Sequence, residues 1–110
     1  NTWVFFDVVS KVWGFIGFVV SDFTAIAEMV NHGIGNSQEV GVKALKAGVD
    51  MDMIADCYHA VLKKSLEEGK ITEAEIDSAC RRILISKYQL GLFHDPYKYC
   101  NPKRAAKEYL

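Results

Sequence analysis

The chain has 110 residues, of which half are hydrophobic and a quarter are charged, and its formal net charge is −1. This balance is typical of a globular protein and argues against a disordered chain or a nucleic-acid-binding protein. Two basic pairs, Lys63-Lys64 and Arg81-Arg82, stand among acidic residues on predicted helices. We therefore expect them on solvated helix faces, with no basic patch for nucleic acid.

Residues 3–20 form an apolar stretch that raises the question of a membrane span. Asp7 and Lys11 interrupt it, whereas a spanning helix needs about 20 predominantly apolar residues. We therefore expect no membrane span. The sequence begins inside a helical pattern and stops soon after Asn101, which would cap a new helix. We expect the chain to be a piece of a larger protein.

The predicted elements alternate between helices and strands. Apolar residues recur at helical spacing over residues 2–12, and this pattern breaks at Gly14. Residues 17–21 then form an apolar run without alternation, which is typical of a parallel strand covered on both faces. The alternating residues 49–53 predict a second strand.

The remaining segments read mainly as helices. A short segment at 25–30 and a loop rich in Gly and Asn precede a helix at 38–47, which Ser37 is expected to cap. Further helices are predicted at 56–68 and 73–89, and Thr72 with Glu75 forms a capping box at the start of the second. Strands that alternate with helices predict parallel βα units, so the fold class is α/β.

No cofactor or metal is expected. The three cysteines are odd in number and widely spaced, which indicates neither a disulfide framework nor a zinc site. The acidic stretch VDMDMIAD resembles the start of a calcium loop, but counting from Asp50 places Ala55 and Val61 where that loop needs Gly and Glu. The stretch GKIT lacks the glycine and the spacing of a phosphate-binding loop.

Asp22 stands directly after the predicted strand at 17–21. In βα barrels the active site is built at the carboxyl ends of the strands, so an acid at this place is a catalytic candidate. A carboxylate there can act as the nucleophile in glycoside cleavage. Spacing alone leaves a second interpretation open, in which Asp22 only caps the next helix.

Three sequence blocks carry a family resemblance. They are WGFIGFVVSDFTAI at 13–26, KALKAGVDMDM at 43–53 and GKITEAEIDSACRRILISKYQLGLFHDPY at 69–97. In order and separation, they resemble the glycoside hydrolase family 3 β-glucosidases. The resemblance implies the C-terminal portion of a (β/α)8 TIM barrel, a helix-rich piece with about two parallel strands. Residues 1–97 would be the final βα units, and 98–110 would begin the linker to a second domain.

The resemblance also implies a function for the intact enzyme. It would be a retaining hydrolase that releases terminal β-D-glucose from β-glucosides without a cofactor, in the periplasm or outside the cell. The Ser-Asp motif of the family supplies the nucleophile, here Asp22, while the acid/base residue belongs to the second domain. Phe23, Met53 and Tyr58 are predicted to line the sugar pocket, and packing remains an alternative role for each.

Two departures from the family pattern concern the surroundings of the sugar. Residues 9–12 read Val-Ser-Lys-Val, where the family usually carries an Arg and an acid, and Phe23 replaces a usual Trp or His. The alternative function is a non-catalytic α-helical interaction module. The 110-residue piece alone is expected to be inactive and to self-associate through Trp3 to Val20.

Overall fold

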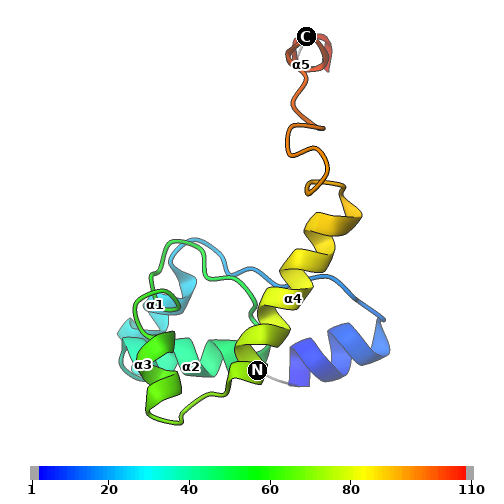
Figure 1. The fold of residues 1–110 in the computed structure, drawn as a ribbon. Coiled ribbons are helices and arrows are strands. Elements are labelled where there is room, and N and C mark those ends of the chain that lie inside the picture. The colour runs from blue at the N-terminus through cyan, green and yellow to red at the C-terminus, as the bar shows by residue number, and fades with distance from the viewer. Residues whose placement is uncertain (1–2, 109–110) are drawn as a thin grey trace.

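The computed structural model describes residues 3–108, and at Ala105 the backbone alone. The elements in chain order are η1 (Trp3–Val12), α1 (Ala25–Asn31), α2 (Ser37–Ala47), α3 (Leu62–Glu67), α4 (Glu73–Gln89) and α5 (Pro102–Glu108). Helix α2 contacts α1, α3, α4 and η1 and is therefore the centre of the structure. Figure 1 shows α4 leading away from this centre toward α5 at the far end.

Helix η1 is wound more widely than an α-helix. The Trp13 N–H donates to the carbonyl of Val8, five residues back, at 3.0 Å. The helix buries none of its residues, and it leans on the end of α2, where a Cβ added at Gly48 would come within 3.1 Å of the Phe6 ring. Gly14 takes a φ of 67°. The predicted helix and its end are confirmed, while residue 2 lies outside the described residues.

Helix α2 begins one residue earlier than predicted, because its cap is Asn36 and not Ser37. The Asn36 side chain accepts a hydrogen bond from the Glu39 N–H at 3.0 Å, and the Glu39 carboxylate accepts one from the Asn36 N–H at 2.9 Å. Asn36 has a glutamate three residues later, whereas Ser37 has Val40 at that distance. Only Asn36 can therefore complete a reciprocal capping box.

The two predicted strands lie side by side in parallel, but the described residues form no strand. A single bridge joins Val20 to Met51, and the Ser21 N–H donates to the Met51 carbonyl at 2.9 Å. A strand inside a parallel sheet is hydrogen-bonded to a neighbouring strand on each side. Within the described residues, each of these two segments has the other as its single hydrogen-bonded neighbour. The parallel direction was predicted correctly, and the regular strands were not.

The helix predicted at 56–68 is shorter than expected, since α3 covers only Leu62–Glu67. Ile54 and Asp56 take positive φ angles of 67° and 56°, which a right-handed helix excludes. The Asp52 carboxylate accepts hydrogen bonds from the N–H groups of Cys57 at 2.7 Å and Tyr58 at 3.2 Å. Both residues lie in what was predicted to be the first helical turn. The Asp52 side chain stabilises turns in place of the first helical turn.

Helix α4 is the longest helix of the described chain, as predicted for residues 73–89. Its capping box is also confirmed, because the Thr72 hydroxyl accepts from the Glu75 N–H at 3.3 Å and the Glu75 carboxylate accepts from the Thr72 N–H at 2.7 Å. The latter bond lowers the pKa of Glu75. Of the residues in this helix, only Ala79 is buried.

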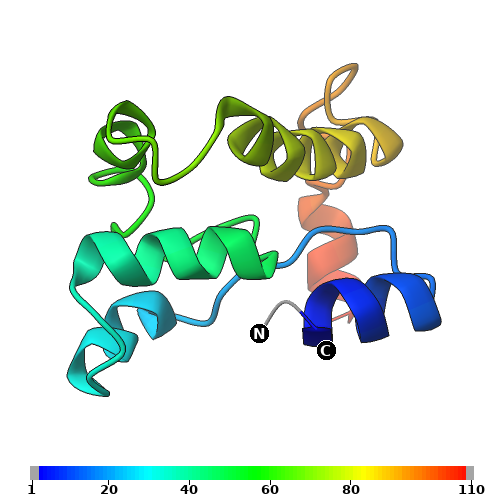
Figure 2. The same cartoon turned by 90° about the horizontal axis from the view of Figure 1, so that it is seen from below.

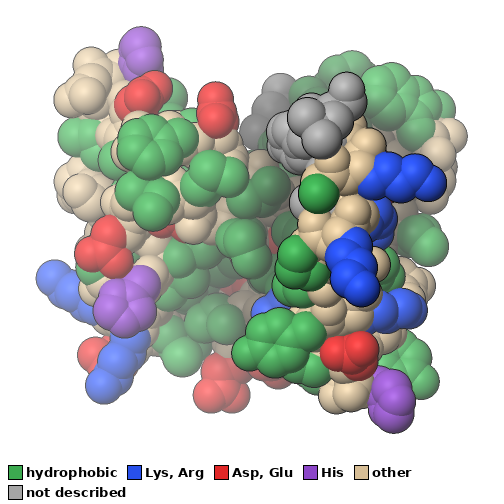
Figure 3. Space-filling model, turned by 90° about the horizontal axis from the view of Figure 1, so that it is seen from above, with side chains coloured by type: hydrophobic (Ala, Val, Ile, Leu, Met, Phe, Trp, Pro, Cys, Tyr) green, Lys and Arg blue, Asp and Glu red, His purple; other side chains and the backbone are tan. Residues whose placement is uncertain are grey.

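Two small clusters of buried side chains form the core. One contains Ile26, Val40, Ala44 and Cys57, and the other contains Leu45, Ile71 and Ala79. Figure 2 shows why both involve α2, which lies between α1 on one side and α3 and α4 on the other. Many hydrophobic side chains remain exposed on the surface (Figure 3). None of the described helices is long and apolar enough to cross a membrane.

Candidate active site

Asp22 lies at the end of the extended segment 17–21, where the sequence predicted it. Its residue is exposed, and one carboxylate oxygen accepts a hydrogen bond from the Phe23 N–H at 2.7 Å. The other oxygen accepts none from residues 3–108. Asp22 does not cap α1 with its side chain, because the capping position is Thr24 and no side-chain bond is made there.

The turn that carries Asp22 is fixed on both sides by Met53. The Ser21 hydroxyl accepts from the Met53 N–H at 2.9 Å, and the Thr24 N–H donates to the Met53 carbonyl at 3.0 Å. Thr24 takes a φ of 54°, a conformation that costs a β-branched residue on the order of 1–3 kcal/mol. The two bonds to Met53 hold this turn in place despite that cost.

Asp22 faces a hollow of about 530 Å³ between the segment 17–21, α1 and α2. The hollow is mostly apolar, with Ile26 and Met29 on the α1 side and Ala44 on the α2 side, and Lys43 is its basic residue. Lys43 donates to the Ile34 carbonyl at 2.6 Å. Ile26 and Ala44 also belong to the first core cluster, so this wall of the hollow is part of the core.

Phe23 follows Asp22 directly in the chain, and the backbone of Met53 bonds to the same turn. Their side chains are open to solvent, Phe23 being 61% and Met53 39% exposed. Neither of them lines the hollow at Asp22. Neither is committed to the two core clusters.

Tyr58 lies apart from this group. Its hydroxyl donates to the Val49 carbonyl at 2.6 Å, its ring packs against both core clusters, and burial raises its pKa well above the usual value. It lines a second hollow of about 360 Å³ together with Asp52 and His59, and not the one at Asp22. The structure therefore does not bring Tyr58 together with the other predicted site residues.

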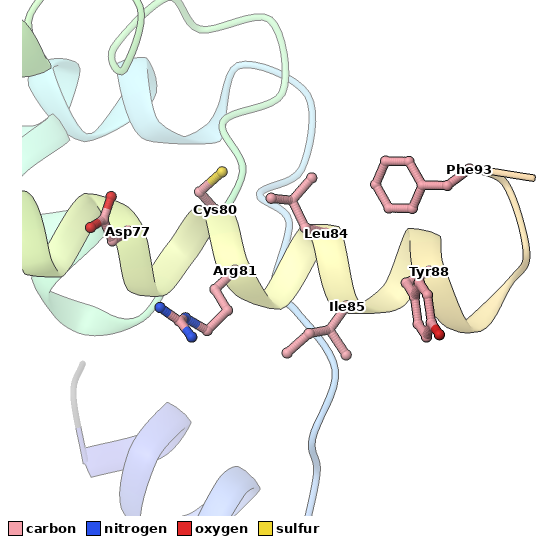
Figure 4. Close-up of a pocket in the computed structure, with 7 residues that line it drawn as sticks. All are labelled: Asp77, Cys80, Arg81, Leu84, Ile85, Tyr88 and Phe93. Atoms are coloured by element: carbon pink, nitrogen blue, oxygen red, sulfur yellow. The ribbon is translucent and has the colours of Figure 1, made fainter.

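A further hollow, of about 570 Å³, lies along α4. Figure 4 shows Leu84, Ile85 and Tyr88 of that helix around it, with Phe93 beyond the helix end. Cys80, which the periodicity places on the apolar side of α4, is exposed here. This hollow is of similar size to the one at Asp22, and its charged residues are Asp77 and Arg81. It offers no group placed for glycoside chemistry.

The buried ion pair of Asp50 with Arg82 is the feature near the site that sequence reasoning missed. Asp50 is buried, with a side chain only 1% exposed, and Arg82 pairs with it at 2.6 Å. The acid was interpreted as a residue at a strand end, and Arg82 was predicted on a solvated face. That prediction is wrong for Arg82. An acid inside an apolar strand was the available signal, because a buried carboxylate requires a partner.

The described residues contain no group of three or more side chains that could hold a metal ion. His59 and Asp56 are near each other at 3.3 Å, but both are largely exposed.

Comparison with known proteins gives the family. The model of the glycosyl hydrolase family 3 N-terminal domain matches residues 1–85. The chain belongs to glycosyl hydrolase family 3. A periplasmic β-glucosidase of Salmonella typhimurium is 44% identical over 106 residues, and a β-xylosidase of Formosa agariphila is 38% identical over 102 residues. These alignments cover 96% and 84% of this chain.

Solved structures agree with this family. The β-glucosidase from Listeria innocua superposes with a TM-score of 0.90 at 40% identity, over 100% of this chain and 15% of the other. A mutant of that enzyme, solved in complex with laminaribiose, gives the same TM-score at 39% identity. The chain spans about 14% of the length of the Salmonella and Formosa relatives.

Proposed function

We propose that this chain supplies the nucleophile of a retaining β-glucosidase, and that Asp22 is that nucleophile. The observation that carries the proposal is the position of Asp22: its turn is fixed by two hydrogen bonds to Met53, and one of its oxygens is unoccupied by the described residues. The 44% identical relative named a periplasmic β-glucosidase supports the same reaction.

The proposed reaction proceeds in two steps. The Asp22 carboxylate attacks the anomeric carbon and forms a covalent glycosyl-enzyme while a second carboxyl group protonates the leaving oxygen. That second group then removes a proton from water, which releases the sugar with retained configuration. In retaining enzymes the two carboxyl groups lie about 5–5.5 Å apart. The second group belongs to a part of the intact enzyme outside this chain.

The substrate is a terminal β-linked sugar, with glucose as the first candidate. Phe23 and Met53 border the sugar through their exposed side chains. Phe23 follows Asp22 in the chain, and the Met53 backbone bonds to the same turn. Tyr58 is not assigned to the sugar pocket, because it lines a different hollow and its hydroxyl is bound to the Val49 carbonyl. Xylosides form the second candidate class, because one of the relatives is named a β-xylosidase.

The proposed architecture is the C-terminal portion of a (β/α)8 barrel. Residues 1–97 would be its final βα units, and 98–110 would begin a linker to a second domain. The family model over residues 1–85 and the TM-score of 0.90 support this placement. The parallel contact between segments 17–21 and 49–53 is what two neighbouring barrel strands require.

Asp22→Asn in the full-length enzyme tests the function. Hydrolysis of an aryl β-glucoside should fall by on the order of 10³-fold or more, because an amide cannot form the ester intermediate. The fold should remain intact, since the amide has nearly the same shape. Asp77→Asn, a change at an exposed acid of α4, is the matched control and should leave turnover unchanged.

A second experiment identifies the nucleophile directly. A 2-fluoro glucosyl inhibitor should trap the glycosyl-enzyme, and peptide mass analysis should place the label on Asp22. A label on Glu28 or Asp50 would overturn the assignment. The 110-residue chain alone should not hydrolyse the same aryl glucoside, because the proposed site needs two carboxyl groups.

A further inference from the structure

Asp50 holds three hydrogen bonds with its carboxylate, and they connect three parts of the chain. One oxygen accepts from the Val19 N–H at 2.9 Å. The other accepts from Arg82 twice, from Nε at 2.9 Å and from Nη2 at 2.6 Å. The segment before Asp22, the segment at 49–53 and helix α4 therefore meet at this side chain.

The bond to Val19 is reciprocal. The Val19 carbonyl accepts from the Asp50 N–H at 2.8 Å, while the Val19 N–H donates to the Asp50 carboxylate. Both polar backbone groups of Val19 are thus bound to Asp50. A shift of Val19 along the neighbouring segment would break both bonds, so Asp50 fixes the register of the two segments.

Arg82 determines the orientation of the Asp50 carboxylate. Its two donors converge on one oxygen and leave the second oxygen directed at Val19. A buried carboxylate is stable only when paired and hydrogen-bonded, and the side chain of Asp50 is 1% exposed. Loss of Arg82 would therefore leave the charge of Asp50 uncompensated and free the carboxylate to turn.

Val19 precedes Asp22 by three residues in the same extended segment. Beyond Val19, the Ser21 N–H donates to the Met51 carbonyl, and the Ser21 hydroxyl accepts from the Met53 N–H. The segment that ends in Asp22 is therefore attached at its base by Asp50 and at its tip by Met53. Of these two attachments, only the one at Asp50 is linked to helix α4, through Arg82.

We propose that Asp50 and Arg82 are positioning residues for the nucleophile. Arg82 orients the Asp50 carboxylate, Asp50 holds Val19 in register, and this register places the Asp22 carboxylate against the substrate. The inference rests on the proposed role of Asp22. Asp50 itself does not act as the acid or base, because both of its oxygens are occupied and its side chain is closed to solvent.

Arg82→Lys in the full-length enzyme is the main test, because it retains the charge and removes the two-donor fork of the guanidinium. Arg81→Lys, the same exchange at the exposed neighbouring residue, is the matched control. We expect kcat for an aryl β-glucoside to fall at least about tenfold in Arg82→Lys, as expected for a misplaced reacting group. KM should change by less than about twofold, and Arg81→Lys should match the native enzyme.

The rate at which a 2-fluoro glucosyl inhibitor labels Asp22 should fall by the same factor as kcat. This rate is measured on folded enzyme, below the start of thermal unfolding of each variant. Labelling at the native rate in folded Arg82→Lys would overturn the proposal. So would a loss of kcat that disappears after correction for the fraction of folded protein, since a purely structural role predicts that result.

Amide hydrogen exchange provides a measurement that does not depend on catalysis. Val19 should exchange slowly in the native enzyme and faster in Arg82→Lys, while Met53, at the tip of the same pair of segments, should change less. Fast exchange of Val19 in the native enzyme would overturn the proposal even if no variant folds. If a label shows that Asp22 is not the nucleophile while Val19 responds as expected, the function fails and the Val19–Asp50–Arg82 connection stands.

Discussion

Two regions of this chain differ in how they are held. The body, which comprises residues 17–83, contains both core clusters, the Asp50–Arg82 pair and the turn of Asp22. The arm, which comprises residues 84–108, has no buried side chain among those described. Figure 1 shows it extending away from the body. Chemistry that requires atoms in fixed positions belongs to the body, because the side chains of the arm lie at the surface.

The body achieves this order with few buried residues. Each core cluster contains only three or four buried side chains. Hydrogen bonds between distant segments therefore do much to fix the positions of the segments in the body. Asp50, Ser21 and Tyr58 each bond to a backbone group at least nine residues away. In the arm, the Tyr99 hydroxyl makes one comparable bond, to Leu90, and it is exposed. Exposed bonds of this kind contribute little.

The largest expected effect comes from the same truncation made in each region of the intact protein. Leu45→Ala should lower the free energy of unfolding by about 2–5 kcal/mol, because Leu45 is 6% exposed and packs in the second cluster. Leu90→Ala, at a residue that is 48% exposed, should cost less than about 1 kcal/mol. Thermal and urea unfolding measure both. Equal costs would mean that the arm is as well packed as the body.

The second prediction concerns a close contact inside the body. A Cβ added at Gly41 would collide with the backbone carbonyl of Cys57. Gly→Ala within a helix normally stabilises by roughly 0.5–1 kcal/mol, but overpacking against backbone costs about 1–3 kcal/mol. Gly41→Ala should therefore destabilise the intact protein. Lys63→Ala, on an exposed face of α3, is the control and should stay within about 0.5 kcal/mol. A stabilised Gly41→Ala would contradict the contact between α2 and Cys57.

The third prediction concerns the end of α4 that lies in the body. Thr72→Ala removes the hydroxyl of the capping box and should cost about 1 kcal/mol near pH 7. The hydrogen bond from the Thr72 N–H lowers the pKa of Glu75 below its usual 4.5. The stabilisation by the Glu75 carboxylate is therefore present above pH 4.5 and is lost as the pH falls through the lowered pKa of the folded state. Unfolding experiments between pH 7 and pH 3 should show that Glu75→Ala costs less in acid. A cost independent of pH would contradict the ionised capping box.

Local signals were sufficient to predict α4 and the end of η1. The Thr72–Glu75 box and the positive φ of Gly14 depend on residues close in sequence. The start of α3 was missed because Asp52 binds the N–H groups that a helix would use. The prediction of two regular strands was wrong because regular strands depend on neighbouring strands, which a local pattern does not identify.

At the candidate site, too, local features could be predicted from the sequence and contacts between distant segments could not. The place of Asp22 was predicted from the apolar run that precedes it, while its proposed role rests on the family resemblance. The parallel contact of the two segments brings the Met53 backbone to the same turn. The pairing of Asp50 with Arg82 spans 32 residues, and alternation within 49–53 says nothing of a partner so far away. The hydroxyl bond of Tyr58 to Val49 was equally invisible. What sequence reasoning missed at the site was therefore contacts between distant segments.

The last prediction has the smallest expected effect on stability. It concerns substitutions of exposed apolar side chains in the 110-residue chain alone. Ile16 is 82% exposed beside the body and Tyr88 is 73% exposed on the arm, so Lys at either place should alter the unfolding free energy by no more than about 0.5 kcal/mol. Exposed apolar surface favours self-association, and we expect the contact within Trp3 to Val20.

Size-exclusion chromatography should therefore show oligomers of the native chain. Ile16→Lys should shift them toward the monomer, because a charge in that contact would have to be desolvated, whereas Tyr88→Lys should elute like the native chain. A shift with Tyr88→Lys alone would move the contact to the apolar hollow of α4 in Figure 4. A monomeric native chain would show that the exposed side chains of neither region are sufficient for association.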